Sequence, residues 1–98
     1  MRLLLARDLR YDADFRCRIV VDAKRVLAEH AVSTLLLSGD CAGRESSLAI
    51  IDWAYKKRRL PKHITLIEPG PRLCRVIGDM LTTRGYRALD MRNFVSRT

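Results

Sequence analysis

The chain has 98 residues, 48% of them hydrophobic and 31% charged, and its net charge is +8 at pH 7. A chain of this length and composition forms one domain with a single modest core, which excludes an intrinsically disordered protein. No apolar run approaches the ~20 residues of a membrane span, so we expect no membrane partner, and no signal peptide is indicated.

Hydrophobic patterns predict the elements of the first half of the chain. Leu35, Leu36 and Leu37 form a continuous apolar run, which is typical of a strand covered on both faces. Asp22 is expected to be the N-cap of the first helix. In chain order we predict a strand over 1–6, a polar loop over 8–15, a strand over 16–21, a helix over 22–30 and a strand over 32–37.

The second half continues the alternation of helices and strands. Pro61 ends one helix, Pro71 suits the first turn of the next, and Gly85 suits the position after its end. We predict a helix over 45–59, a strand over 63–67, a helix from 71 to Gly85 and a strand over 86–91. The predicted core stripe of the third helix is Leu73, Val76, Ile77, Met80 and Leu81.

Strands that alternate with helices favour a mostly parallel sheet with helices on both faces. We therefore predict a three-layer α/β fold with about five mostly parallel strands. Residues 1–91 are predicted to form this single domain. Residues 92–98 are predicted to form a C-terminal tail that frays.

Four segments resemble one protein family in residue type and spacing. They are Leu3-Leu4-Leu5 in the first strand, the loop at 38–43, the helical segment 50–54 with Trp53, and the segment 60–65 leading into a strand. Together they resemble the cyclic-phosphate-processing receiver domain family, which is common in phages, over residues 1–88. The resemblance implies a receiver-like, or flavodoxin-like, fold.

The acidic pocket of that family is only partly matched here. Its acidic pair after the first strand falls on Ala6 and Arg7, and the first acid of its loop falls on Ser38, so only Asp40 carries over. A hard cation such as Mg²⁺ needs several converging oxygen ligands. We therefore predict no catalytic residues, no metal site and no cofactor, and we favour a protein that is not an enzyme.

The loop after the third strand is a candidate anion-binding site. Its glycines permit close backbone approach, the helix that follows offers free N–H groups, and Arg44 adds a positive charge. The alternative is an ordinary strand-to-helix turn in which a serine caps the helix. The candidate residues are Gly39, Asp40, Gly43, Arg44, Ser46 and Ser47.

The densest group of cations is a candidate partner-binding surface at the end of the second predicted helix. Acidic protein surfaces and phosphate backbones are both attracted by such a cluster. The alternative is that these cations are solvated and complement the negative end of the helix dipole. The residues are Lys56, Lys57, Arg58, Arg59 and Lys62.

Three cysteines, Cys17, Cys41 and Cys74, lack metal-site spacing and cannot all pair, which predicts reduced thiols and a cytoplasmic location. We predict a non-enzymatic interaction module that binds an acidic protein through its basic surface. The resemblance implies a small phage accessory protein that modulates a host protein. The alternatives are processing of RNA or cyclic-phosphate ends through Asp40, and plain nucleic-acid binding.

Overall fold

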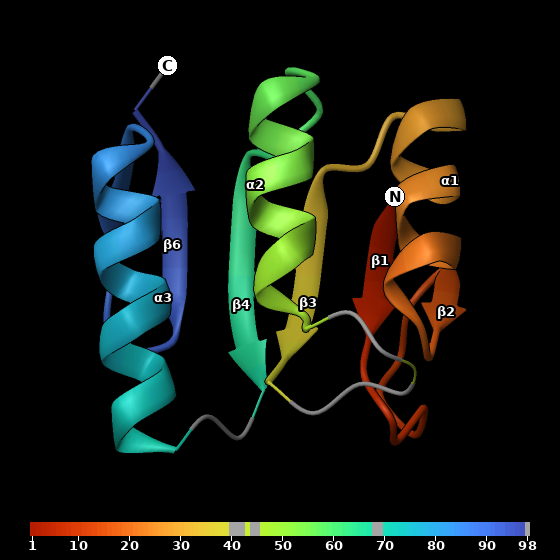
Figure 1. Cartoon of the computed structure of the whole chain (residues 1–98), viewed down its shortest axis with the longest axis horizontal. Coiled ribbons are helices and arrows are strands. Elements are labelled where there is room, and N and C mark those ends of the chain that lie inside the picture. Colours follow the sequence, from red (N-terminus) through yellow and green to blue (C-terminus); the bar gives the residue numbers. More distant parts are fainter. Residues whose placement is uncertain (40–42, 44–45, 68–69, 98) are drawn as a thin grey trace.

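The structure is a computed structural model that describes residues 1–39, 43, 46–67 and 70–97. It is a small α/β domain in which helices and strands form two layers (Figure 1). In chain order its elements are β1 (Arg2–Leu5), β2 (Phe15–Cys17), α1 (Val20–Glu29), β3 (Thr34–Ser38), α2 (Leu48–Lys56), β4 (His63–Ile67), α3 (Pro71–Thr83), β5 (Tyr86–Ala88) and β6 (Asn93–Ser96).

The strands form one mixed sheet in the order β2-β1-β3-β4-β6-β5. The first four strands of this order run parallel, because long connections carry the chain back to the same end of the sheet each time. Strand β6 is antiparallel to both of its neighbours, β4 and β5. The last strand of the chain is therefore inserted between β4 and β5 rather than placed at the edge.

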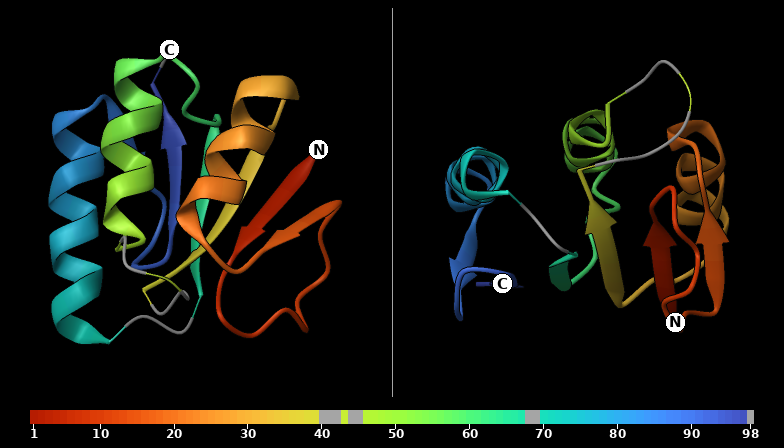
Figure 2. Two further views of the ribbon diagram at one scale, coloured as in Figure 1. Left: turned by 45° about the vertical axis from the view of Figure 1, so that its right-hand side comes forward. Right: turned by 90° about the horizontal axis from the view of Figure 1, so that it is seen from below.

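All three helices cover the same face of the sheet (Figures 1 and 2). The strand residues that face them form a row across the sheet: Leu3 pairs with Leu35, Leu35 with Ile64, and Ile64 with Phe94. All four of these side chains are at most 3% exposed. The helices contribute the buried residues Ala23, Leu27, Ile50, Ile51, Ala54, Ile77 and Leu81 to the same core.

None of the described helices lies on the other face of the sheet (Figure 2), and we call it the helix-free face. The connection from β1 to β2 crosses part of it, and Leu9, Tyr11 and Ala13 pack there against a smaller cluster. That cluster consists of Leu4, Ala6, Leu36 and Ile67. The rest of this face includes a cross-strand row of partly or fully exposed residues, namely Arg2, Thr34, His63, Val95 and Arg87.

The predicted three-layer fold with about five mostly parallel strands and helices on both faces is wrong. The sheet has six strands, β6 runs antiparallel to both β4 and β5, and the described helices lie on one face only. One reason is that residues 8–14, a loop as predicted, cross the face of the sheet where a three-layer fold would carry a helix. The other is the chain reversal after β5, which brings the final strand back beside β4.

The segment predicted to be a C-terminal tail contains a strand, β6. Asp90 causes the reversal, because its Oδ1 accepts hydrogen bonds from the backbone N–H groups of Arg92 and Asn93 at 2.7 and 2.8 Å. An aspartate that binds the backbone two residues on is a frequent turn former. Residues Asn93–Ser96 then form β6, and Phe94 enters the core at 3% exposure.

Several predicted element boundaries also move. The second strand ends at Cys17, and α1 begins at Val20 with Ile19 rather than Asp22 at the N-cap position. In α3, Ile77 and Leu81 are buried, and Leu73 and Met80 pack against the core, but Val76 is 40% exposed. Gly85 follows α3 with φ +87°, the left-handed conformation predicted for it. None of the described helices is long and apolar enough to cross a membrane.

Candidate functional site

The cluster of cations predicted from the sequence lies at the C-terminal end of α2. The helix ends in a paired hydrogen-bond motif: Arg58 N–H donates to Tyr55 O at 3.1 Å, and Arg59 N–H donates to Ala54 O at 2.8 Å. This is the Schellman arrangement, which satisfies the last helix carbonyls and turns the chain sharply. It spreads consecutive cations around the helix end instead of continuing the helix.

Arg58 occupies the left-handed position of this motif, with φ +56°. Glycine is the usual residue there, because a Cβ atom in this conformation costs roughly 1–2 kcal/mol. Arg58 therefore keeps its charged side chain at a cost in backbone energy. Such a cost is a physical reason to look for a role of the Arg58 side chain beyond folding.

The cations of the cluster, Lys56, Lys57, Arg58, Arg59 and Lys62, are all exposed. None of them forms an ion pair with any residue that the structure describes. Arg84, one helix away, shows the contrast, because its guanidinium pairs with Asp52 and is only 23% exposed. The charges at the end of α2 are thus directed to solvent and are available to a partner.

The C-terminal strand adds a further cation to this end of the molecule. Ser96 N–H donates to Lys62 O at 2.8 Å, and Arg97 N–H donates to Gly85 O at 2.9 Å. Arg97 thereby follows directly on the strand segment that lies against Lys62. We call the resulting surface the basic rim, and it comprises Lys56, Lys57, Arg58, Arg59, Lys62 and Arg97. Arg97 is absent from the cluster predicted from the sequence, because residues 92–98 were predicted to form a C-terminal tail.

Aromatic side chains are scarce at the basic rim. Tyr55 is 50% exposed, but the guanidinium of Arg84 lies 5.4 Å from the centre of its ring. Trp53 is half-buried, and the ammonium of Lys24 lies 5.9 Å from its ring centre. Both rings are therefore engaged with cations of the protein itself, which leaves less aromatic surface for stacking of nucleic-acid bases.

The predicted anion-binding loop lies at the other end of α2. Asp40 and Arg44 fall outside the described residues, so the structure does not test their part of the site. Gly43 has φ +88°, a conformation that favours glycine. Ser46 Oγ accepts a hydrogen bond from Leu48 N–H at 3.2 Å, a local turn bond, whereas Ser47 at the N-cap position makes no side-chain capping bond.

Ser47 is the unusual residue of this loop. Its side chain is 1% exposed, and its Oγ has no hydrogen-bond partner among the described residues. A buried hydroxyl without a partner is unfavourable by about 1–3 kcal/mol. Gly39, the remaining described residue of the predicted loop site, is exposed. Since α2 has nine residues, the loop and the basic rim are separated by roughly 13 Å of helix and do not form one site.

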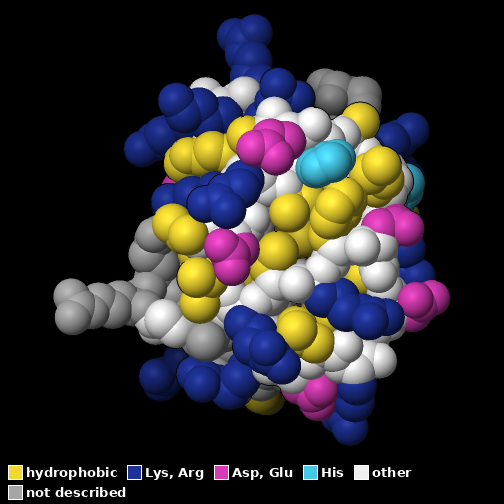
Figure 3. All heavy atoms as spheres, turned by 90° about the vertical axis from the view of Figure 1, so that its right-hand side faces the viewer, with side chains coloured by type: hydrophobic (Ala, Val, Ile, Leu, Met, Phe, Trp, Pro, Cys, Tyr) yellow, Lys and Arg dark blue, Asp and Glu magenta, His cyan; other side chains and the backbone are white. Residues whose placement is uncertain are grey.

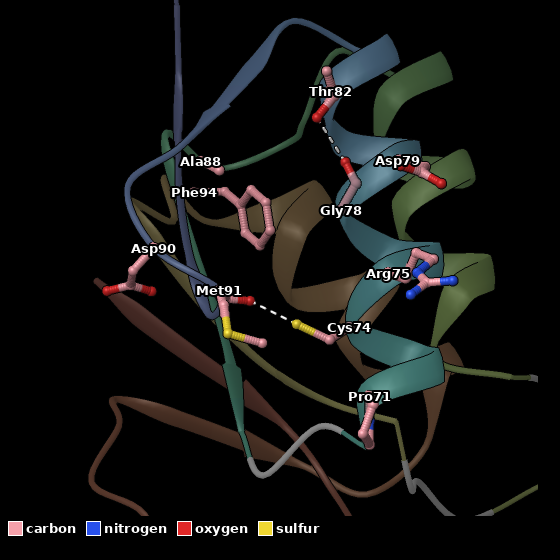
Figure 4. A pocket seen from close by; sticks show the side chains of 10 residues that line it. All are labelled: Pro71, Cys74, Arg75, Gly78, Asp79, Thr82, Ala88, Asp90, Met91 and Phe94. Atoms are coloured by element: carbon pink, nitrogen blue, oxygen red, sulfur yellow. Dashed lines mark hydrogen bonds between the residues drawn. The ribbon is translucent and has the colours of Figure 1, made fainter.

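Two larger grooves lined by described residues lie away from the loop and the basic rim. The first, of about 630 Å³, runs between α3 and the β5–β6 hairpin, with Phe94 pointing from β6 toward Gly78 (Figure 4). Cys74 Sγ donates a hydrogen bond to Met91 O across it at 2.7 Å. Its charged residues are one arginine and two aspartates, Arg75, Asp79 and Asp90, so its charge does not favour an anion.

The second groove, of about 460 Å³, lies on the helix-free face over β3 and β4. Its floor contains Leu36 and Thr65, and its walls come from two distant segments of the chain. Tyr11 and Asp12 form one wall, and Arg92 and Asn93 form the other. Nothing in the local sequence patterns indicates this groove, because its residues come together through strand register and through the packing of the β1–β2 connection on the sheet.

Acidic and basic side chains are interspersed on the side of the molecule formed by β2 and α1 (Figure 3). Figure 3 shows Lys and Arg side chains around its margin with Asp and Glu between them, and hydrophobic side chains toward the centre. His30 lies here with its ring 4.5 Å from that of Phe15, which accounts for the histidine as a packing residue. This mixture of charges distinguishes the β2–α1 side from the basic rim.

The described residues contain no group of three His, Cys, Asp or Glu side chains arranged to hold a metal ion. Cys17 is buried, and desolvation together with the nearby Asp22 raises the pKa of its thiol. A raised pKa lowers the thiolate fraction, so Cys17 is a poor nucleophile.

Comparison with known proteins finds no matching family model, no matching curated protein and no matching solved structure. The resemblance to the cyclic-phosphate-processing receiver domain family stays a prediction.

Proposed function

We propose that this protein is a non-enzymatic interaction module that binds an acidic protein surface through its basic rim. The observation that carries the proposal is a set of six exposed cations at one end of the molecule, none of them paired with a described acid. Helix-dipole complementation explains a cation in the last turn of α2. It does not explain why Arg58 is kept in a left-handed conformation.

The scarcity of free aromatic rings favours a protein partner over nucleic acid. Single-stranded nucleic acids are held by cationic grooves together with aromatic platforms on which bases stack. The rings nearest to the basic rim, Tyr55 and Trp53, are engaged with Arg84 and Lys24. The proposal that the partner is a host protein rests on the family resemblance alone. The proposal of a cytoplasmic location rests on the three cysteines.

The test compares two variants that each lose four positive charges. In the rim variant, Lys56, Lys57, Arg58 and Arg59 are replaced by Gln. In the control variant, four exposed arginines away from the rim are replaced by Gln, namely Arg18, Arg25, Arg72 and Arg75. The probes are a fluorescent polyglutamate peptide and a single-stranded oligonucleotide of equal charge. Stopped-flow measurements give the association rate of each probe, and anisotropy measurements give its affinity.

We expect wild type and the control variant to bind polyglutamate rapidly and the rim variant to associate much more slowly. Long-range attraction acts mainly on the association rate, and it weakens as salt shortens the Debye length from about 10 Å at 0.1 M to about 3 Å at 1 M. Equal slowing in both variants would mean that net charge alone matters. Tighter, rim-dependent binding of the oligonucleotide would replace the protein partner with nucleic acid.

A further inference from the structure

Strand β5 lies at one end of the sheet order, and its outer edge is unpaired. In an antiparallel pair, hydrogen-bonded positions alternate with positions that are not hydrogen-bonded. Gly85 O and Leu89 N–H, which flank β5, bond to the chain at the two ends of β6, at 2.9 and 2.8 Å, so the backbone of Arg87 between them also faces β6. The N–H and C=O groups of Tyr86 and Ala88 therefore point away from β6, and no hydrogen bond joins them to the described part of the chain.

A groove lies beside this edge on the helix side of the sheet. It is the groove of about 630 Å³ between α3 and the β5–β6 hairpin, with Gly78 on one wall and Ala88 on the other (Figure 4). Neither residue brings a large side chain into it, and Met91, which is 74% exposed, lines it as well. A strand added beside β5 directs every second side chain to the helix side. The edge and the groove together thus fit an extended peptide with apolar side chains at alternate positions.

The other side of β5 carries positive charge. Arg87 pairs with Val95 in the row that faces the helix-free side, and Arg87 and Arg97 line one hollow of about 390 Å³ together with Val95 and Ser96. Both arginines are exposed, and neither forms an ion pair with a residue that the structure describes. Opposite charges in facing positions of neighbouring strands attract. The incoming strand is therefore expected to carry an acidic residue opposite Arg87.

The same arginine disfavours a second copy of this chain as the occupant of the edge. Antiparallel pairing of two β5 strands through Tyr86 and Ala88 places Arg87 directly opposite its counterpart, and like charges in that position are destabilising. A shift by two residues retains only one complete hydrogen-bonded pair, because the N–H groups of Arg84 and Asp90 are bonded within the chain. Charged residues on an edge strand are a common means of preventing such association.

From these features we infer that β5 binds an extended segment of a partner protein as an added antiparallel strand, a recurring mode of peptide recognition. The segment has an acidic residue opposite Arg87 and an apolar residue on each side of it. The backbone of the two apolar residues pairs with Tyr86 and Ala88, and their side chains lie on the side of the α3 groove. The site shares Arg97 with the basic rim but needs none of the cations at the end of α2. It therefore goes beyond the function proposed for the rim and does not rest on it.

Nuclear magnetic resonance of the full chain with synthetic peptides tests this inference. The probe is a peptide with the central sequence Val-Glu-Val, and the charge control has Val-Lys-Val. Two further peptides carry one N-methyl group each. It replaces either the N–H of the first valine, which pairs with β5, or the N–H of the glutamate, which points away from β5. The protein variants are Arg87→Glu and, as the matched reversal of an exposed arginine far from β5, Arg25→Glu.

We expect the Val-Glu-Val peptide to slow hydrogen exchange of the Tyr86 and Ala88 amides, which it covers, but not that of the Arg87 amide, which already faces β6. Val-Lys-Val should bind roughly three- to tenfold more weakly. Arg87→Glu should remove or reverse this preference, and Arg25→Glu should keep it. The N-methyl group on valine should weaken binding by roughly tenfold or more, whereas the one on glutamate should change it by less than about twofold.

Four outcomes would overturn the inference. Unchanged exchange of the Tyr86 and Ala88 amides in the presence of Val-Glu-Val would exclude strand addition. Equal weakening by the two N-methyl groups would mean that the peptide is held by its side chains alone. A preference for Val-Glu-Val that persists in Arg87→Glu would exclude the role assigned to the arginine. Exchange at Tyr86 and Ala88 that slows with rising protein concentration in the absence of peptide would make a second copy the occupant.

Discussion

The hydroxyl of Tyr86 donates a hydrogen bond to the carbonyl oxygen of Pro61, a residue 25 positions earlier in the chain. Tyr86 begins β5, and Pro61 stands between the cations of α2 and Lys62. The bond therefore ties the C-terminal hairpin to the turn that carries the basic rim. Both residues are buried, so the bond is shielded from water and its loss exposes an unpaired carbonyl to the core.

This bond predicts a dependence of stability on alkaline pH. Burial raises the pKa of Tyr86 from 10.0 to about 12. Since the folded state favours the neutral phenol, this stabilisation is complete below pH 10 and is lost as the pH rises from 10 to about 12. Tyr86→Phe should lower the free energy of unfolding by about 1–3 kcal/mol at pH 7 and by less at pH 12. Urea unfolding at both pH values gives the comparison, and an equal difference at both would contradict it.

Replacement of the strained arginine separates stability from binding. Arg58→Gly should raise the free energy of unfolding by about 1 kcal/mol, because glycine adopts φ +56° without a Cβ penalty. The same change should slow association with polyglutamate, because it removes a cation of the basic rim. Arg58→Asn is the matched control for the loss of charge, because asparagine also carries no charge and also tolerates the left-handed conformation. A loss of stability in Arg58→Gly would mean that the arginine side chain makes a stabilising contact.

The buried hydroxyl at the start of α2 provides a test of the predicted anion site. Ser47→Ala should leave stability unchanged or raise it by up to about 1 kcal/mol, because the hydroxyl has no partner among the described residues. Ser46→Ala should instead destabilise the protein, since Ser46 Oγ accepts a hydrogen bond from Leu48 N–H. If phosphate raises the melting temperature of wild type but not that of Ser47→Ala, the loop binds anions through this hydroxyl.

The packing of α3 predicts unequal effects of two neighbouring substitutions. Ile77 is 0% exposed, and Ile77→Ala should lower the free energy of unfolding by roughly 2–5 kcal/mol through the cavity it creates. Val76 is 40% exposed, and Val76→Ala should change the free energy of unfolding by less than about 0.5 kcal/mol. Denaturant titrations distinguish this from the stripe predicted from sequence, in which Val76 and Ile77 both pack against the sheet.

Asp90 predicts the behaviour of the hairpin in acid. The backbone N–H of Arg92 and the amide groups of Asn93 lower the pKa of this carboxyl below its ordinary value of 3.8. The stability that the Asp90 carboxylate contributes is present above pH 3.8. It is lost as the pH falls through the lowered pKa of the folded state. Asp90→Ala should therefore speed amide hydrogen exchange in β5 and β6 at pH 6 but differ little from wild type in strong acid. Unchanged exchange at pH 6 would show that the turn forms without the carboxylate.

Local sequence patterns determined the parts of this protein that depend on neighbours along the chain. The helical period of residues 71–83 predicted α3, the apolar run at Leu35–Leu37 predicted β3, and Gly85 marked the end of α3. The four consecutive cations likewise identified most of the basic rim, because charge density at a helix end is visible in the chain itself. Such patterns report which residues are buried, but not what buries them.

Only the tertiary structure decided which face of the sheet each segment covers and which distant residues meet. Periodicity does not distinguish a polar loop that crosses the back of a sheet from one that projects into water, so the role of residues 8–15 was hidden. The same limit applies to β6, whose place between β4 and β5 depends on the Asp90 turn and on pairing with residues about 30 positions away. The register of β6 brings Arg97 to the rim and Arg92 close to Thr65, whereas Tyr11 reaches the groove because the β1–β2 connection packs across the helix-free face.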